Sequence, residues 1–233
     1  MRKLYNKYHH AIPVLIYFVV YMLWFNYIET HRATSYTVIH TALDDKIPFC
    51  EFFIVPYFIW FGYVAIAVVY LFFADKKGYY NACTFLMTGM TVFLVISTFF
   101  PNVQHLRPYL IPGENVFTDM VRHLYSIDTP TNLWPSIHVY NSIAVYIAVA
   151  HDERLGKNPY VKNGSLLLTT LIILSTMFLK QHSVFDVATA FIMAAVVYVL
   201  VYRLDAVVSL RAFLHMKRKR KGSLAKVTAR LSN

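Results

Sequence analysis

Residues 52–73 read FFIVPYFIWFGYVAIAVVYLFF, an apolar run of 22 residues without a charged side chain. A helix of about 20 mostly apolar residues crosses the hydrocarbon core of a bilayer, because each residue rises roughly 1.5 Å. The chain as a whole is 58% hydrophobic and 15% charged, whereas soluble domains carry about 25% charged residues. These features predict a membrane protein and argue against a soluble or largely disordered one.

Five further segments repeat this apolar pattern on both sides of the first. Three are nearly free of charge, and two are shorter and carry more hydroxyl groups. In chain order the five are residues 11–27, 82–100, 135–150, 165–179 and 185–202. The sequence therefore predicts an all-α polytopic membrane protein with six transmembrane helices, built as a single membrane-embedded domain over residues 1–233.

The distribution of basic residues predicts the orientation of these spans. Six spans place both termini on one side, and 17 of the 22 Lys and Arg residues fall on that side. The positive-inside rule then predicts that both termini are cytoplasmic. The basic tail, about residues 211–233, follows a span closely, which favours contact with anionic membrane lipids over binding of nucleic acid.

The longest stretch between spans is residues 101–134. Within it, apolar side chains recur at helical spacing behind Asn115, a suitable N-cap residue; they are Phe117, Met120, Val121 and Leu124. We expect a short amphipathic helix at the outer interface, either as a packed cover or as part of a binding site.

Asp186 is an ionisable residue inside an apolar segment, which makes it a functional candidate. His182 lies four residues earlier, so a helix places both side chains on one face. A carboxylate that accepts from Nδ1 of an imidazole leaves Nε2 free as a nucleophile. The alternative interpretation is a buried pair that only joins two helices.

A second group of polar residues is expected at the same outer face. Pro135-Ser136 precedes a predicted helix, whose unpaired N–H groups favour anions, and His138 follows within one turn as a possible proton donor. Arg107 and Lys180 are candidate phosphate ligands. Since Lys180 and His182 would point in opposite directions on one helix, the chain is predicted to break between residues 179 and 183. Arg122 is an alternative to Arg107, and His105 and His123 flank the site.

Together these motifs resemble the type 2 phosphatidic acid phosphatase superfamily, which includes relatives of the sphingomyelin and inositol phosphorylceramide synthases. Arg107-Pro108 is similar to the end of its first motif. Pro135, Ser136 and His138 match its second, with Ile137 in place of glycine. Ser175, His182 and Asp186 keep the spacing of its third. The chain departs from the family at two positions: Phe100 stands where the family has a lysine, and Thr176 stands where it has an arginine. Lys180 is expected to supply the positive charge that is missing at Thr176.

The resemblance implies a plasma-membrane lipid phosphatase whose site faces the extracytoplasmic side. By this resemblance, His182 would be the nucleophile that forms a phosphohistidine, and Asp186 would orient it. His138 would act first as the general acid and then as the general base. Arg107, Lys180 and Ser136 would bind the phosphate, and no metal or other cofactor is expected. The expected substrates are phosphatidic acid-like lipids or polyprenyl pyrophosphate. A lipid phosphotransferase, and a transporter or catalytically silent scaffold, are the alternatives.

Overall fold

The computed structural model describes residue 8 and residues 11–31, 33–111 and 113–204. Seven α-helices are described, together with one π-helical turn: α2 (Ile12–Thr30), α3 (Ile54–Ala74), α4 (Lys76–Phe99), α5 (Val116–Ile127), α6 (Ile137–His151), α7 (Pro159–Phe178), α8 (Val184–Tyr198) and η4 (Val199–Arg203). Short 3-10 turns and two-residue strands complete the described part: η2 (Asp44–Lys46), η3 (Glu51–Phe53), β1 (Thr37–Val38) and β2 (Asn102–Val103).

Five of the described helical segments are long and apolar enough to cross a membrane: Ile12–Thr30, Glu51–Ala74, Lys76–Phe99, Pro159–Phe178 and Val184–Arg203. The prediction of a mostly helical chain with several apolar helices of membrane-spanning length is confirmed. The remaining predicted span, residues 135–150, is the shorter helix α6, which has 15 residues. The basic tail, residues 211–233, lies outside the described residues.

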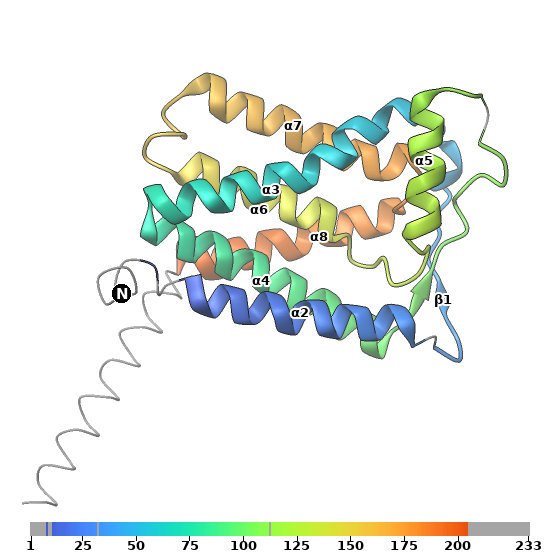
Figure 1. Ribbon diagram of the computed structural model, residues 1–233, viewed down its shortest axis with the longest axis horizontal. Helices are drawn as coiled ribbons and strands as arrows, with labels where there is room; N and C mark the ends of the chain where they lie inside the picture. The colour runs from blue at the N-terminus through green and yellow to red at the C-terminus, as the bar shows by residue number, and fades with distance from the viewer. Residues whose placement is uncertain (1–7, 9–10, 32, 112, 205–233) are drawn as a thin grey trace, which may run out of the picture.

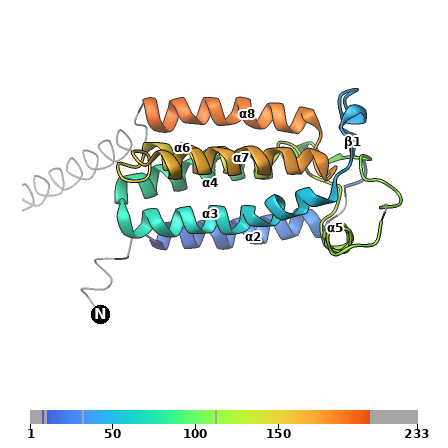
Figure 2. The same ribbon diagram turned by 90° about the horizontal axis from the view of Figure 1, so that it is seen from above.

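The long helices form one bundle in which successive helices run in opposite directions (Figure 1). Helix α5 lies across one end of this bundle, and both views show it nearly perpendicular to the other helices (Figures 1 and 2). The strands β1 and β2 pair in parallel at the same end. We call this the α5 end, because the loops that surround the candidate site gather there.

Helix α6 occupies the centre of the bundle and contacts α3, α4, α7 and α8. Its Tyr140 is fully buried, and the hydroxyl group donates to the carbonyl oxygen of Phe85 at 2.8 Å. The ring lies against Gly89 of α4, where a Cβ atom would come within 2.0 Å of it. Only glycine lets α4 and α6 approach this closely. This contact fixes the position of α6, which carries His138 in its first turn.

The predicted amphipathic helix and the predicted chain break are both confirmed. Helix α5 starts behind Asn115, whose side chain accepts hydrogen bonds from the backbone of Phe117 and Thr118. Helix α7 ends at Phe178 and α8 begins at Val184. Lys180 lies between them with a φ of 53°, a left-handed conformation that ends α7 and reverses the chain.

Candidate functional site

His182 and Asp186 form the pair that the spacing predicted. Nδ1 of His182 lies 3.3 Å from Oδ2 of Asp186, and both side chains are buried. Ser183 is the N-cap of α8, and Asp186 completes a capping box by accepting from the Ser183 N–H at 3.1 Å. The carboxylate therefore both starts the helix and orients the imidazole. With Nδ1 facing Asp186, the Nε2 atom of His182 is free for chemistry.

The same Asp186 oxygen also accepts a short hydrogen bond from Nε2 of Gln104. Gln104 is 2% exposed and follows β2, and its own N–H donates to the carbonyl oxygen of Pro130 at 3.0 Å. Three donors thus converge on one carboxylate oxygen. This arrangement fixes the position of the Asp186 carboxylate beside the imidazole.

His138, in the first turn of α6, faces His182 across a small cavity. The two ring centroids are 5.7 Å apart. The His138 ring is held by aromatic neighbours on α3, with centroid distances of 4.7 Å to Tyr57 and 4.3 Å to Trp60. Its Nδ1 atom is buried without a hydrogen-bond partner. Both histidines therefore line one cavity.

The cavity between these rings encloses about 60 Å³. Residues of α2 form part of its lining, and its walls combine aromatic and aliphatic side chains with two carboxylates. The lining residues are Phe25, Glu29, Phe93, Asp128, Thr131, Asn132, Leu133, Ile137, His138 and His182. Asp128 follows the last residue of α5; burial raises the pKa of its carboxyl group, whereas the charge of Arg107 lowers it.

Arg107 does not line this cavity but pairs with Asp128, which does. Its Nη2 lies 3.9 Å from an Asp128 carboxylate oxygen and donates to Oε1 of Gln181 at 2.7 Å, while Nη1 donates to the Asp128 carbonyl oxygen at 2.7 Å. The guanidinium also stacks on Tyr125, 4.5 Å from the ring centroid. Arg107 is thus linked to Gln181, the residue that precedes His182, and its Nη1 and Nη2 atoms are already bound to protein oxygens.

Lys180 does not lie where the sequence analysis placed it. Its Nζ atom donates to the carbonyl oxygens of Asp44 at 2.7 Å and Ile47 at 2.5 Å, on the loop before α3. The left-handed backbone at Lys180 directs the side chain toward this loop, away from the cavity between the histidines. The expectation that Lys180 replaces the missing arginine of the third motif is therefore wrong in this conformation.

Ser136 also differs in detail from the prediction. It is the N-cap of α6, so Pro135 precedes the helix and does not form its first turn. The Ser136 N–H donates to the carbonyl oxygen of Asp186 at 3.5 Å, and its hydroxyl group accepts from the N–H of Val139 at 3.4 Å. This geometry ties the start of α6 to α8, which holds His138 beside His182. It also occupies the N–H that was expected to bind phosphate.

The two positions at which the chain departs from the family provide no cation either. Thr176 is fully buried, and its carbonyl oxygen accepts from the N–H groups of Gln181 and His182, so it shapes the turn before α8. Phe100 is 64% exposed at the end of α4. Arg122 pairs with Asp119 on the outer surface of α5 at 2.7 Å, which does not favour it as a replacement for Arg107.

Asp44 is a residue that the sequence analysis missed. It is 2% exposed, and its carboxylate accepts from the Ser183 hydroxyl and the Val184 N–H, each at 2.7 Å. It therefore joins the loop before α3 to the first turn of α8, directly after His182. The sequence gives no indication that Asp44 binds the start of α8, because its partners are about 140 residues away along the chain.

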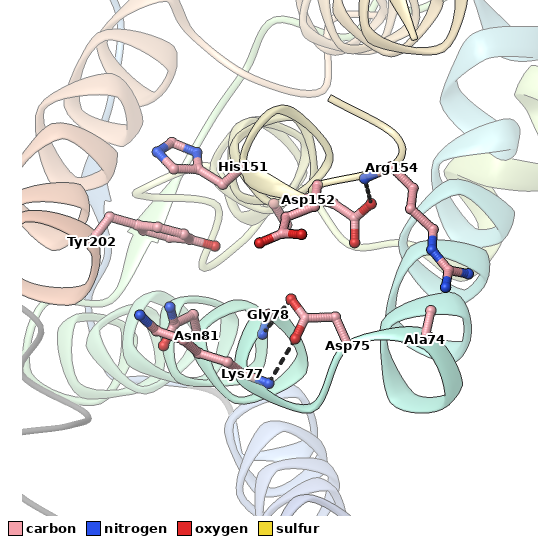
Figure 3. A pocket seen from close by; sticks show the side chains of 11 residues that line it. Ala74, Asp75, Lys77, Gly78, Asn81, His151, Asp152, Arg154 and Tyr202 are labelled. Carbon is pink, nitrogen blue, oxygen red and sulfur yellow. Dashed lines mark hydrogen bonds between the residues drawn. The ribbon is translucent and has the colours of Figure 1, made fainter. Parts of the chain in front are cut away.

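A larger cavity of about 650 Å³ (Figure 3) lies where α3 ends and α4 begins, at the opposite end of the bundle from α5 (Figure 1). None of the predicted site residues lines it. Two of its carboxylates serve as caps: Asp75 accepts from the N–H groups of Lys77 and Gly78, and Asp152 accepts from the N–H of Arg154. The chemistry expected from the motifs therefore belongs to the smaller cavity at the α5 end.

No family model, curated protein or solved structure matches this chain. Its function therefore has to be inferred from the residues themselves. Within the described residues, no three His, Cys, Asp or Glu side chains are arranged to hold a metal ion. The histidine pair and its carboxylate are the arrangement with the clearest chemical capability.

Proposed function

We propose that this chain is a membrane enzyme that hydrolyses a phosphate ester of a lipid through a phosphohistidine intermediate. The observation that carries the proposal is the buried His182–Asp186 pair facing His138 across a cavity. One imidazole is oriented by a carboxylate and the other is not, which suits a nucleophile and a proton-transfer group respectively. The resemblance to the type 2 phosphatidic acid phosphatase superfamily supports the same roles.

The proposed reaction has two steps. Nε2 of His182 attacks phosphorus, while a protonated His138 donates its proton to the leaving oxygen. Water then attacks the phosphohistidine, and His138 accepts a proton from it. Asp186 stabilises the positive charge on His182 in both steps, and Arg107 contributes positive potential at the cavity edge.

We propose six spans, with the sixth provided by α6. At 15 residues, α6 is about 22 Å long, shorter than a hydrocarbon core of roughly 30 Å. Its contacts with four other helices allow a short central helix, since protein surrounds its ends in place of lipid. With both termini cytoplasmic by the positive-inside rule, the α5 end faces the extracytoplasmic side of the plasma membrane.

A lipid phosphotransferase is the second candidate, favoured by the walls of the cavity. Phe25, Phe93, Ile137 and Leu133 surround the histidines and leave little room for bulk water. Under these conditions a lipid hydroxyl group that enters from the membrane competes well with water for the phosphohistidine. Incubation with a labelled phospholipid and candidate alcohols separates the two, because transfer yields a new phospholipid and hydrolysis yields a soluble phosphate compound.

The test of the proposed function is turnover by detergent-purified protein. Phosphatidic acid, polyprenyl pyrophosphate and phosphodiester lipids are supplied in micelles, with and without excess EDTA, and soluble phosphate compounds are measured. We expect turnover that EDTA does not reduce and that His182→Ala lowers by at least about three orders of magnitude. His123→Ala, at an exposed position of α5, is the matched control and should retain activity. A strict requirement for added Mg²⁺ would contradict the mechanism.

A further inference from the structure

The larger cavity, at the opposite end of the bundle from α5, has no part in the proposed chemistry. It encloses about 650 Å³, a volume typical of sites for small organic molecules. The helical segments α3, α4 and η4 all belong to candidate spans, and they end or begin at its walls through Ala74, Asp75 and Tyr202. With these spans in the membrane, as proposed above, the cavity lies at the level of the head groups of the cytoplasmic leaflet.

Asn81 of α4 indicates that a polar ligand belongs in this cavity. Asn81 is 7% exposed, and its amide group faces the cavity (Figure 3). This amide has no hydrogen-bond partner in the part of the chain that the structure describes. The hydroxyl group of Tyr202, at the same cavity, is buried and also lacks a partner among the described residues. Buried polar groups without partners are uncommon unless a ligand or water satisfies them.

Two carboxylates lie on facing walls of the cavity, those of Asp75 before α4 and Asp152 after α6 (Figure 3). Each Asp75 oxygen accepts from one backbone N–H, and Oδ1 of Asp152 accepts from two. Oδ2 of Asp152 has no hydrogen-bond partner within the described ranges, although the residue is only 7% exposed. Because a carboxylate can accept about four hydrogen bonds, both groups retain capacity for a cation that donates several.

The charges that line the cavity differ between its buried and its exposed parts. Asp152 is buried and Asp75 partly buried, whereas Lys77, Glu153 and Arg154 are exposed. The interior therefore carries two negative charges, and the exposed part carries one net positive charge. The guanidinium group of Arg154 pairs with no group in the described part of the chain. An ammonium group inside and a phosphate group at Arg154 match this separation of charge.

An apolar groove of about 370 Å³ adjoins the polar cavity between α6 and α8. The groove and the cavity share His151 as a lining residue. Aliphatic and aromatic side chains form most of the groove, among them Ile147, Ala194 and Phe191, and Phe191 is 48% exposed. A polar cavity beside an exposed apolar groove suits an amphiphile, whose head group enters the cavity while an acyl chain lies in the groove.

We infer that this cavity binds the head group of a zwitterionic phospholipid of the cytoplasmic leaflet, one that carries a primary ammonium group. The ammonium group donates hydrogen bonds to Asp75, Asp152 and the Oδ1 atom of Asn81, and Arg154 donates to the phosphate group. The bound lipid thereby joins the start of α4 to the end of α6. This inference rests on the proposed orientation of the spans, and it does not depend on the phosphohistidine chemistry.

The experiment titrates detergent-purified protein with short-chain phosphatidylethanolamine, phosphatidylcholine and phosphatidylglycerol. The rise in unfolding temperature gives an apparent Kd for each lipid. Phosphatidylcholine has the same charges but no N–H donor on its ammonium group, and phosphatidylglycerol lacks the positive charge. We expect phosphatidylethanolamine to bind about tenfold more tightly than either, the effect of a hydrogen bond between charged groups.

Variants of the cavity test whether this preference arises there. Asn81→Leu replaces the amide by an apolar group of similar size and should bring the three Kd values close together. Asn163→Leu, at an exposed position of α7 outside the cavity, is the matched control and should keep the preference. If Asn81→Leu does not fold, Asp152→Asn replaces it, because asparagine can still accept from the backbone N–H groups that Asp152 caps.

The outcomes separate this site from the histidine cavity and from a soluble ligand. Equal affinities for the three lipids, or a preference that persists in the cavity variant, overturn the inference. His182→Ala should keep the preference, because His182 lines the other cavity, and loss of the preference would assign it to that cavity. Soluble phosphoethanolamine should produce no shift at concentrations at which the lipid saturates. Equally tight binding that depends on Asn81 would identify a soluble ligand and overturn the assignment to a lipid.

Discussion

The rings of His138 and His182 lie 5.7 Å apart, although they belong to the starts of two different helices, α6 and α8. The hydrogen bond from the Ser136 N–H to the Asp186 carbonyl oxygen joins these two helix starts directly. Both rings then face one cavity, lined also by carboxylates. A paired geometry of this kind can divide nucleophilic attack and proton transfer between two imidazoles.

The role of Asp186 can be measured by one isosteric change. Asp186→Asn keeps the size of the side chain but removes the charge that orients His182 and stabilises its imidazolium form. We expect kcat to fall by about 10³- to 10⁴-fold, the size of effect known for loss of an orienting carboxylate beside a catalytic histidine. Asp119→Asn, at an exposed position of α5, should leave kcat unchanged. Equal activity of the two variants would remove Asp186 from the mechanism.

Asp44 should contribute to stability through its bonds to the start of α8. Asp44→Asn weakens the hydrogen bonds to Ser183 and Val184, and we expect it to lower the free energy of unfolding by about 1–3 kcal/mol. Asp45→Asn is the matched control, because Asp45 is exposed and its carboxylate pairs with His40 at the surface. Thermal unfolding in detergent compares them. Identical unfolding temperatures would show that the loop before α3 does not hold the turn at His182.

The same residue predicts a dependence of stability on pH. Burial alone would raise the pKa of Asp44, but hydrogen bonds from Ser183, Val184 and Thr41 lower it below its ordinary value. A carboxyl group with a lower pKa in the folded state stabilises the fold above its unfolded pKa, and this contribution is lost as the pH falls through the folded pKa. The unfolding temperature of the wild-type protein should therefore drop below about pH 4. Asp44→Asn should show a smaller drop, and an equal drop would contradict the assignment.

Close packing between α4 and α6 gives a prediction about the fold alone. Gly89→Ala places a methyl group against the ring of Tyr140 and should destabilise the protein by about 1–3 kcal/mol, the cost of overpacking. Gly62→Ala meets no atom within 4 Å and should be neutral or slightly stabilising, because alanine favours helices. Similar unfolding temperatures for both variants would show that Tyr140 moves away at low cost.

Much of this structure followed from the sequence, because its main signals are local. Apolar runs predicted the long helices, Asn115 predicted the start of α5, and the opposed directions of Lys180 and His182 predicted the break before α8. The His182–Asp186 contact agrees with the spacing of four, although His182 precedes the N-cap Ser183 and so lies just outside α8.

The surroundings of the histidines could not be predicted in this way. Gln104, Asp44 and Asn132 reach them through loops whose paths depend on tertiary contacts, and Lys180 turns away because of a single left-handed residue. Glu29 carried a readable signal, since it is an ionisable residue directly after the first apolar segment. An ionisable residue inside an apolar segment is a functional candidate, and this rule identified Asp186. It would also have identified Glu29 if the first segment, residues 11–27, had been extended by two residues.

The most direct test of the phosphohistidine is to trap it. Lipid labelled with radioactive phosphorus in its phosphate group is mixed with purified protein, the reaction is stopped with denaturant at alkaline pH, and the labelled peptide is identified. The account predicts label on His182, in a form stable to base and labile to acid, at higher occupancy in His138→Ala when breakdown of the intermediate is slowed, and absent in His182→Ala. Turnover of the lipid with label on a different residue, or with undiminished activity in His182→Ala, would contradict it.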